Sequence, residues 1–146
     1  MNAIIEKTGN ENGYDYVVKF FEDGHRCGYV RVPEGHKFYD KFYSDIDIDC
    51  HGGLTFSSYV TERNEFNGLT PGFWIGFDCA HYRDVPDIDM AKAVFGDNKF
   101  LKLKKELAIE FGTEDGFIRT SDYVETECLN IIRQLIKIQN GEKDED

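Results

Sequence analysis

Residues 14–33, YDYVVKFFEDGHRCGYVRVP, decide the fold of this chain. Two runs rich in β-branched and aromatic residues flank the dipeptide Asp23-Gly24. Asp-Gly between two such runs is among the strongest short-range signals for a β-hairpin, because glycine accepts the positive φ that a tight turn requires. We therefore expect an antiparallel sheet that grows outward from this hairpin.

Three further segments read as strands. Residues 73–79, FWIGFDC, form a near-continuous apolar run of strand length, which predicts a central strand buried on both faces. Residues 45–50, DIDIDC, and residues 54–60, LTFSSYV, predict two more strands, separated by a sharp break at His51-Gly52-Gly53. Side chains alternate between the faces of an extended chain, so the acids of DIDIDC would share one face with His51. The isoleucines and Cys50 would share the other face.

The pattern changes after residue 84. Apolar residues recur at helical spacing over 100–111 and again over 121–138. Ser121 or Asp122 can cap the second helix. We expect an α+β fold, with an antiparallel sheet followed by helices packed on it. The chain would form one domain over residues 1–140, with a frayed acidic tail over 141–146. The helical stripes are Phe100, Leu103, Leu107 and Phe111 in the first helix, and Val124, Cys128, Ile131, Leu135 and Ile138 in the second.

The chain is acidic along its whole length, with 28 Asp and Glu against 17 Lys and Arg and a formal net charge of −11. A negative field repels phosphates, so we expect no direct binding to nucleic acid. It attracts basic protein surfaces, although acidity can also serve solubility alone. No apolar run has the length of a membrane span, and the N-terminus lacks the pattern of a signal peptide. These features favour a cytoplasmic protein.

Two histidines follow predicted strands, and their rings would converge if those strands are neighbours. His51 ends the DIDIDC run, and His81 follows Asp78 and Cys79 in the segment DCAH. Imidazole, thiolate and carboxylate are the usual protein ligands of Zn²⁺. The alternative is a core thiol at Cys79, a hydrogen-bonded His51 and a solvated His81. We interpret Cys50 and Cys128 as core residues, because each lies on an apolar face.

Three blocks in this order resemble a family of bacteriophage and prophage proteins: RCGYVRVPEGHKFY, DIDIDCHGGLTFS and FWIGFDCAHYRD, with a final helix like SDYVETECLNIIRQLIKI. The family pattern has G-H-P where this chain has Gly35-His36-Lys37, and Val where it has Cys50. Among such proteins the chain is similar to the anti-CRISPR group that acts on the type II RNA-guided nuclease, which includes a zinc-containing inhibitor. The resemblance implies a zinc site at His51, Asp78, Cys79 and His81, with His36 as the substitute ligand.

The resemblance and the charge together predict a binding inhibitor of the host type II CRISPR nuclease rather than an enzyme. The acidic domain would occupy a positively charged nucleic-acid channel of the nuclease. The predicted aromatic anchors are Tyr39, Phe42, Tyr43 and Phe66. The alternative is a zinc-dependent hydrolase, or a protein that sequesters a nucleotide signal, with Arg31, Arg63 or Arg83 offsetting the negative field. A phage assembly protein without metal is a third possibility. Four protein ligands on the metal would favour a structural role, and three ligands with water would favour catalysis.

Overall fold

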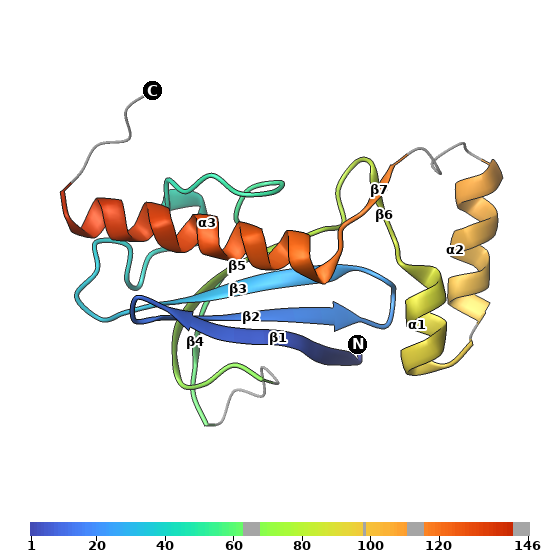
Figure 1. Ribbon diagram of the computed structural model, residues 1–146, viewed down its shortest axis with the longest axis horizontal. Helices are drawn as coiled ribbons and strands as arrows, with labels where there is room; N and C mark the ends of the chain where they lie inside the picture. The colour runs from blue at the N-terminus through green and yellow to red at the C-terminus, as the bar shows by residue number, and fades with distance from the viewer. Residues whose placement is uncertain (63–67, 98, 111–115, 142–146) are drawn as a thin grey trace.

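The structure is a computed structural model that describes residues 1–62, 68–97, 99–110 and 116–141; within 99–110 it describes the backbone alone at residues 100, 104, 105 and 108–110. Its main feature is a five-stranded antiparallel sheet in the order β1-β2-β3-β5-β4 (Figure 1). The fold is α+β, as predicted. The strands of this sheet are β1 (Ala3–Glu11), β2 (Tyr14–Phe21), β3 (Arg26–Val32), β4 (Phe56–Val60) and β5 (Gly72–Asp78).

The hairpin of β2 and β3 is confirmed, with Tyr16 opposite Val30 and Phe20 opposite Arg26. Its turn uses the predicted dipeptide. Gly24 has a φ of +89°, and the Asp23 carboxylate accepts a hydrogen bond from the backbone N–H of His25 at 3.0 Å. The sequence analysis predicted no strand for β1, which precedes this hairpin.

The predicted central strand is also confirmed. β5 lies between β3 and β4, and four of its large side chains are buried: Phe73, Trp74, Ile75 and Phe77. Phe73, Ile75 and Phe77 belong to the core on the face that α3 (Ser121–Gln139) covers, and Trp74 packs with Val17 and Val60 on the opposite face. Both faces of this strand are therefore covered, which explains its nearly continuous apolar sequence.

The strand predicted over residues 45–50 is wrong. A 3₁₀ turn, η1 (Tyr43–Asp45), is followed by an extended segment that pairs with no strand among the described residues. The predicted alternation is nevertheless present, since Ile46 and Ile48 are buried. Asp45, Asp47 and Asp49 are exposed. The reason is that this segment lies over the core beside α3, so its apolar residues are buried without a sheet partner for its backbone.

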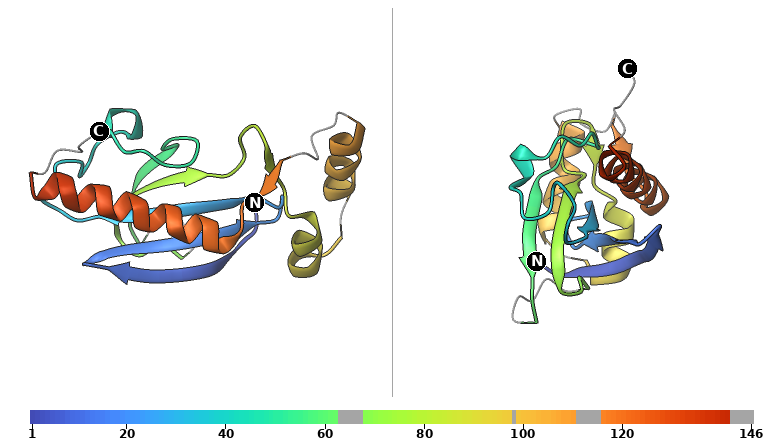
Figure 2. Two further views of the ribbon diagram at one scale, coloured as in Figure 1. Left: turned by 45° about the horizontal axis from the view of Figure 1, so that its top comes forward. Right: turned by 90° about the vertical axis from the view of Figure 1, so that its left-hand side faces the viewer.

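The long C-terminal helix crosses one face of the sheet and contacts β1, β2 and β3 (Figures 1 and 2). Four residues of its predicted stripe are fully buried and Ile138 is partly buried, so the stripe is confirmed. Neither predicted residue is the cap. Thr120 caps the helix, because its hydroxyl accepts a hydrogen bond from the N–H of Tyr123 at 3.2 Å. The Asp122 side chain is instead paired with Lys7. The buried stripe residues are Val124, Cys128, Ile131 and Leu135.

Two shorter helices lie beyond one end of the sheet (Figure 1). They are α1 (Ile88–Phe95), which the sequence analysis did not assign, and α2 (Lys99–Glu110). Two residues of the apolar stripe predicted for the second of these, Leu103 and Leu107, are 52% and 41% exposed, so the stripe is not buried at these positions. Among the α2 side chains that the structure describes, Leu101 is buried, in a small core with Ala91 and Phe20. The side chain of Phe100 and all of Phe111 lie outside the described residues, as do residues 142–146 of the predicted tail.

A short parallel pair, β6 (Asp84–Val85) with β7 (Phe117–Ile118), connects this end of the molecule to the start of α3. None of the helices in the described part of the chain combines the length and the apolar composition needed to cross a membrane.

Candidate functional site

The site forms where two loops meet the N-terminal end of α3. The first loop turns sharply at His51, where Gly52 and Gly53 have φ values of +69° and +82°. A Cβ atom at Gly52 would lie 2.3 Å from Nε2 of His81, which belongs to the second loop. Position 52 therefore requires glycine for its backbone conformation and also for the close approach of the two loops.

The expected convergence of the two histidines is confirmed, since the ring centroids of His51 and His81 are 6.0 Å apart. Their partners, however, are different. His51 contacts the hydroxyl of Tyr123 through Nδ1 at 2.8 Å and the carboxylate of Asp84 through Nε2 at 2.8 Å. Both ring nitrogens of His51 are therefore already engaged within the protein.

Asp84 is the centre of this cluster, and its side chain is only 1% exposed. Its carboxylate accepts hydrogen bonds from Nε of Arg119 at 2.8 Å and from the backbone N–H of His81 at 3.0 Å, besides the contact with His51. We call Asp84, His51, Arg119 and Tyr123 the Asp84 network. It joins residues from the two loops, from the segment before α3 and from the first turn of α3 itself.

The hydrogen bonds of this network keep Asp84 ionised. Burial alone would raise the pKa of its carboxyl group. The hydrogen bonds from His51, Arg119 and the His81 amide outweigh that effect and hold the pKa of Asp84 below its ordinary value. With Asp84 ionised, Nε2–H of His51 donates to it, and Nδ1 lies 2.8 Å from the hydroxyl of Tyr123.

Asp78 and His81 form a second pair at the rim of the site. Nε2 of His81 lies 3.1 Å from Oδ1 of Asp78, but no group of the described residues meets this nitrogen with hydrogen-bonding geometry. The Asp78 carboxylate also accepts from the hydroxyl of Thr55 at 3.0 Å and from the N–H of Ala80 at 3.1 Å. This pair is about one third exposed.

The cysteines near the site lie in or against the apolar core. Cys79 is 2% exposed and packs among the residues under α3. Burial raises the pKa of its thiol, so the thiol remains protonated as placed. Cys128 is fully buried in the same core, and Cys50 packs against it, with a pKa that burial raises to about 12. Cys128 is a core residue, as predicted, whereas Cys50 is half-buried at the edge of that core.

The predicted zinc ligands His51, Asp78 and Cys79 each have partners or surroundings of their own within the protein. Across the part of the chain that the structure describes, no three or more His, Cys, Asp or Glu side chains are placed to hold a metal ion. His51 is directed to Asp84, and Cys79 is buried in the core. The unpartnered Nε2 of His81 is the one observation in favour of a metal. Zinc stays a prediction, and no functional step below depends on it.

The substitute ligand, His36, lies elsewhere. It is buried, with Nε2 2.8 Å from the carbonyl oxygen of Leu135 and Nδ1 accepting from the N–H of Phe38 at 3.0 Å. Leu135 and Tyr123 are separated by about 18 Å along α3, at 1.5 Å per residue. His36 therefore fastens the loop after β3 to the far half of the helix and does not belong to the cluster.

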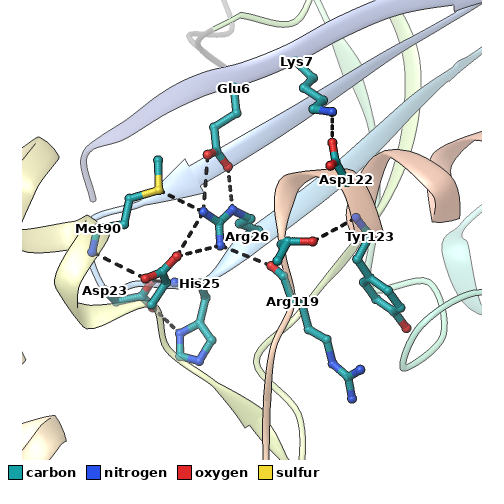
Figure 3. A network of polar contacts seen from close by, with 11 residues as sticks. Glu6, Lys7, Asp23, His25, Arg26, Met90, Arg119, Asp122 and Tyr123 are labelled. Atoms are coloured by element: carbon teal, nitrogen blue, oxygen red, sulfur yellow. Dashed lines mark hydrogen bonds and ion pairs between the residues drawn. The ribbon is translucent and has the colours of Figure 1, made fainter.

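A second polar network braces the same end of the sheet (Figure 3). Arg26 is buried, and its guanidinium group binds the carboxylate of Glu6, with a shortest contact of 2.6 Å, and that of Asp87 at 3.2 Å. It also donates to the backbone carbonyl of Arg119 at 3.2 Å. Because the Arg119 side chain binds Asp84, the two networks meet at this residue. Together they hold the start of α1 and the segment before α3 against the sheet.

The groups of the Asp84 network engage one another rather than an open position. Burial raises the pKa of Tyr123, so its hydroxyl remains a hydrogen-bond donor and is not an activated nucleophile. The sequence analysis missed Asp84, Arg119 and Tyr123. The sequence could have indicated Asp84 as a site residue, because it ends the block FWIGFDCAHYRD. Arg119 and Tyr123 carry no local signal, since an arginine before a helix and a tyrosine within it are ordinary.

Comparisons with known proteins found nothing similar to this chain. No family model matches the chain, and neither the curated proteins nor the solved structures contain a match.

Proposed function

We propose that this chain is a non-catalytic binding protein that inhibits a type II RNA-guided nuclease by occupying its nucleic-acid channel. One observation carries the proposal. The Asp84 network engages both ring nitrogens of His51, the Asp84 carboxylate and the Tyr123 hydroxyl with one another. It thereby fixes two surface loops that expose side chains such as Thr55 and Tyr82. Such a site is built to hold a surface in shape rather than to transform a substrate. The choice of target comes from the family resemblance of the three sequence blocks.

Charge supports this choice of partner. The nuclease holds its nucleic acid in positively charged channels. The chain has a net charge of −11, and four of its acids are exposed within ten residues, at Asp40, Asp45, Asp47 and Asp49. We call residues 40–49 the acidic segment. Opposite charge on the two partners would raise the association rate, and added salt would lower it.

The acidic segment is anchored to the main core and to α3. Ile46 and Ile48 are buried in the main core. The backbone of Asp49 makes two hydrogen bonds with the side chain of Gln134 on α3, at 2.9 and 2.7 Å. Because the segment is already ordered, binding through it would lose little conformational entropy.

Of the four aromatic residues predicted as anchors, Phe42 is available at the surface, with 58% exposure. Tyr39 is half-buried and packs against Tyr59 and Phe73, which makes it part of the fold. Tyr43 is half-buried and its N–H donates to Ser57. Phe66 lies outside the described residues.

The test uses a panel of purified type II nucleases, each loaded with guide RNA, in DNA-cleavage and surface-binding assays. We expect at least one member to bind the protein and to lose cleavage activity at micromolar inhibitor. The variant Asp45→Asn/Asp47→Asn/Asp49→Asn should associate about tenfold more slowly and show a weaker salt dependence.

The matched control, Glu11→Gln/Glu34→Gln/Asp97→Asn, removes the same net charge from exposed acids outside the acidic segment. It should change the association rate far less. If the wild-type protein neither binds nor inhibits any nuclease of the panel, the proposal is wrong.

A metal-dependent hydrolase is the second candidate. Nε2 of His81 is a buried ring nitrogen that no group in the described part of the chain meets with hydrogen-bonding geometry, and it lies beside the Asp78 carboxylate. This candidate is tested by hydrolysis of nucleotide substrates with and without added Zn²⁺. Turnover that requires metal and is abolished by His81→Ala would favour it over the binding protein. A lack of turnover in both conditions would reject it.

A further inference from the structure

A groove runs along α3, where the turn between β1 and β2 faces the helix, and has a volume of about 730 Å³. Its floor is apolar. Leu129 and Ile136 are half-buried there, and Ile132 is buried between them. These residues extend over about 10 Å of the helix, at 1.5 Å per residue. An apolar strip of this length between polar walls suits the apolar face of a short helix.

The helix α2 turns one side to a core and the other to solvent. Leu101 is completely buried and packs with Ala91 and Phe20. Leu103 and Leu107 are instead 52% and 41% exposed. Residues four apart are neighbours on a helix, so these two leucines form one exposed apolar strip. Their spacing is that of the anchor residues by which an amphipathic helix binds a groove.

The rim of the groove has opposite charges in a fixed order along α3. Glu127 comes first, and Arg133 follows six residues later, about 9 Å further along the helix. The guanidinium group of Arg133 donates to the side-chain oxygen of Asn130, which is neutral, so this contact leaves its charge uncompensated. Glu11 adds a second acid from the wall formed by β1. Along α3 the rim is therefore complementary to an occupant that places a base before an acid.

The helix α2 has that complementary order. Lys99 and Lys102 lie in its first turn and are exposed, and Glu106 is exposed one turn later. The first seven residues of α2 contain four lysines and no acid, in a chain whose net charge is −11. A helix laid along α3 in the same direction would bring these lysines to Glu127. Glu106, about 6 Å beyond Lys102 and about 10 Å beyond Lys99, would then face Arg133.

The helix α2 cannot fill the groove of its own chain, because the two surfaces lie at opposite ends of the molecule (Figures 1 and 2). The groove includes Asn12 in the turn before β2. The core of α2 includes Phe20, which lies six residues after the start of β2, about 20 Å along the strand. The occupant therefore comes from another molecule, and a second copy of this chain supplies a helix with the matching charge order and apolar strip.

We propose that α2 of one copy docks into the groove of a second copy. Leu103 and Leu107 then lie on the apolar floor, and the charged side chains of the helix meet charges of opposite sign at the rim. The contact joins unlike surfaces, so it repeats into a chain of copies or is exchanged between two copies as a reciprocal pair. A contact of two helical turns is small, and each copy has a net charge of −11, so we expect a dissociation constant of about 100 µM. This proposal goes beyond the proposed function and does not depend on it.

The experiment measures the weight-average mass by sedimentation equilibrium between about 10 and 500 µM protein, a range that brackets this constant. We expect the mass of the wild-type protein to rise from the monomer value of 16.9 kDa by at least about 1.5-fold. Two variants exchange charges without changing the net charge. They are Lys102→Glu/Glu106→Lys on α2 and Glu127→Lys/Arg133→Glu at the groove, and each by itself should remain a monomer over the same range.

A chain that carries both exchanges should assemble again like wild type, because helix and groove are then complementary once more. Its recovery would also show that neither exchange unfolds the protein. The matched control, Glu34→Lys/Lys37→Glu, exchanges two exposed charges in the loop after β3 and should assemble like wild type. A wild-type mass that stays at 16.9 kDa would overturn the proposal. Assembly of either exchanged variant at the wild-type level, or failure of the combined chain to recover, would overturn it as well.

Discussion

The imidazole of His51 is bound to the carboxylate of Asp84, with Nε2 2.8 Å from Oδ2, across 33 residues of sequence. This contact joins the loop that follows the acidic segment to the turn that presents Tyr82. It also explains why both loops are held against α3, since Tyr123 binds the other nitrogen of the same ring. The expected consequences of this arrangement can be measured without knowing the partner.

Replacing Asp84 by asparagine should destabilise the fold. The amide keeps the size of the side chain but removes the charge that faces His51 and Arg119. We expect a loss of about 2–3 kcal/mol in the free energy of unfolding, typical for breaking buried hydrogen bonds to a charged group. Urea denaturation followed by the fluorescence of the single, buried Trp74 measures it. Asp78→Asn, at the exposed rim, should cost less than about 1 kcal/mol; equal losses in both variants would contradict the central role of Asp84.

The stability should fall in acid in a way that depends on Asp84. Its pKa in the folded protein lies below that of the unfolded chain, because hydrogen bonds to the carboxylate outweigh the effect of burial. The resulting stabilisation is complete above the unfolded pKa of about 3.9 and is lost as the pH falls through the lower folded value. Urea denaturation between pH 2.5 and 6 should show this loss in the wild type, and it should be reduced in Asp84→Asn.

The exposed ion pair between Asp122 and Lys7 also makes the protein less stable in acid, because the contact with Lys7 lowers the pKa of Asp122. Salt screens this surface pair much more strongly than the buried interactions of Asp84. In 0.5 M salt the loss of stability in acid should therefore persist in Asp122→Asn and remain reduced in Asp84→Asn. A pH dependence that vanishes in salt for the wild type would assign the effect to surface charges instead.

Gly28 should tolerate no side chain, because the Phe77 ring and Cys128 of α3 occupy the space that a Cβ atom would need. An added Cβ would lie 2.6 Å from the ring of Phe77 and 2.7 Å from Sγ of Cys128. We expect Gly28→Ala to cost about 1–3 kcal/mol, the usual range for overpacking a core. Gly28→Ala combined with Cys128→Ala should recover part of that loss relative to the sum of the single variants. Strict additivity in this thermodynamic cycle would contradict the contact.

Cys79 should resist alkylation in the native protein. Its thiol is buried and its pKa is raised by burial, so little reactive thiolate forms near pH 8. Iodoacetamide labelling read by peptide mass spectrometry should be slow without urea and fast with it, and a chelator should change neither rate. Faster labelling of Cys79 after chelation, together with zinc in elemental analysis of tag-free protein, would show instead that the thiol is a metal ligand.

Gln134 should control the order of the acidic segment. Gln134→Ala removes both hydrogen bonds to the backbone of Asp49 while Ile46 and Ile48 remain buried. We expect a small loss of stability, about 1 kcal/mol, and faster amide hydrogen exchange over residues 46–50. Asn130→Ala, one turn earlier on α3, is the control and should leave exchange in that segment unchanged. Unaltered exchange in Gln134→Ala would mean that packing alone holds the segment.

The local sequence predicted which side chains are buried better than it predicted which segments pair as strands. The alternation in DIDIDC identified which residues are buried, but the strand it suggested does not exist, because an extended chain becomes a strand only where another strand offers its backbone. In this segment the backbone of Asp49 is instead bonded to the side chain of Gln134 on α3. In the same way, the two histidines following DIDIDC and FWIGFDC do converge, but the residues that bind His51 come from 33 and 72 positions away.

The sequence by itself therefore determined the hairpin, the buried central strand, the amphipathic C-terminal helix and the α+β class. Each of these is decided by residues close in the chain, through turn geometry and through which side chains avoid water. Only the tertiary structure decided that Asp84, Arg119 and Tyr123 surround His51, and that Tyr82 is exposed beside them. Those contacts depend on where packed elements bring distant loops, and no local period of the sequence records that.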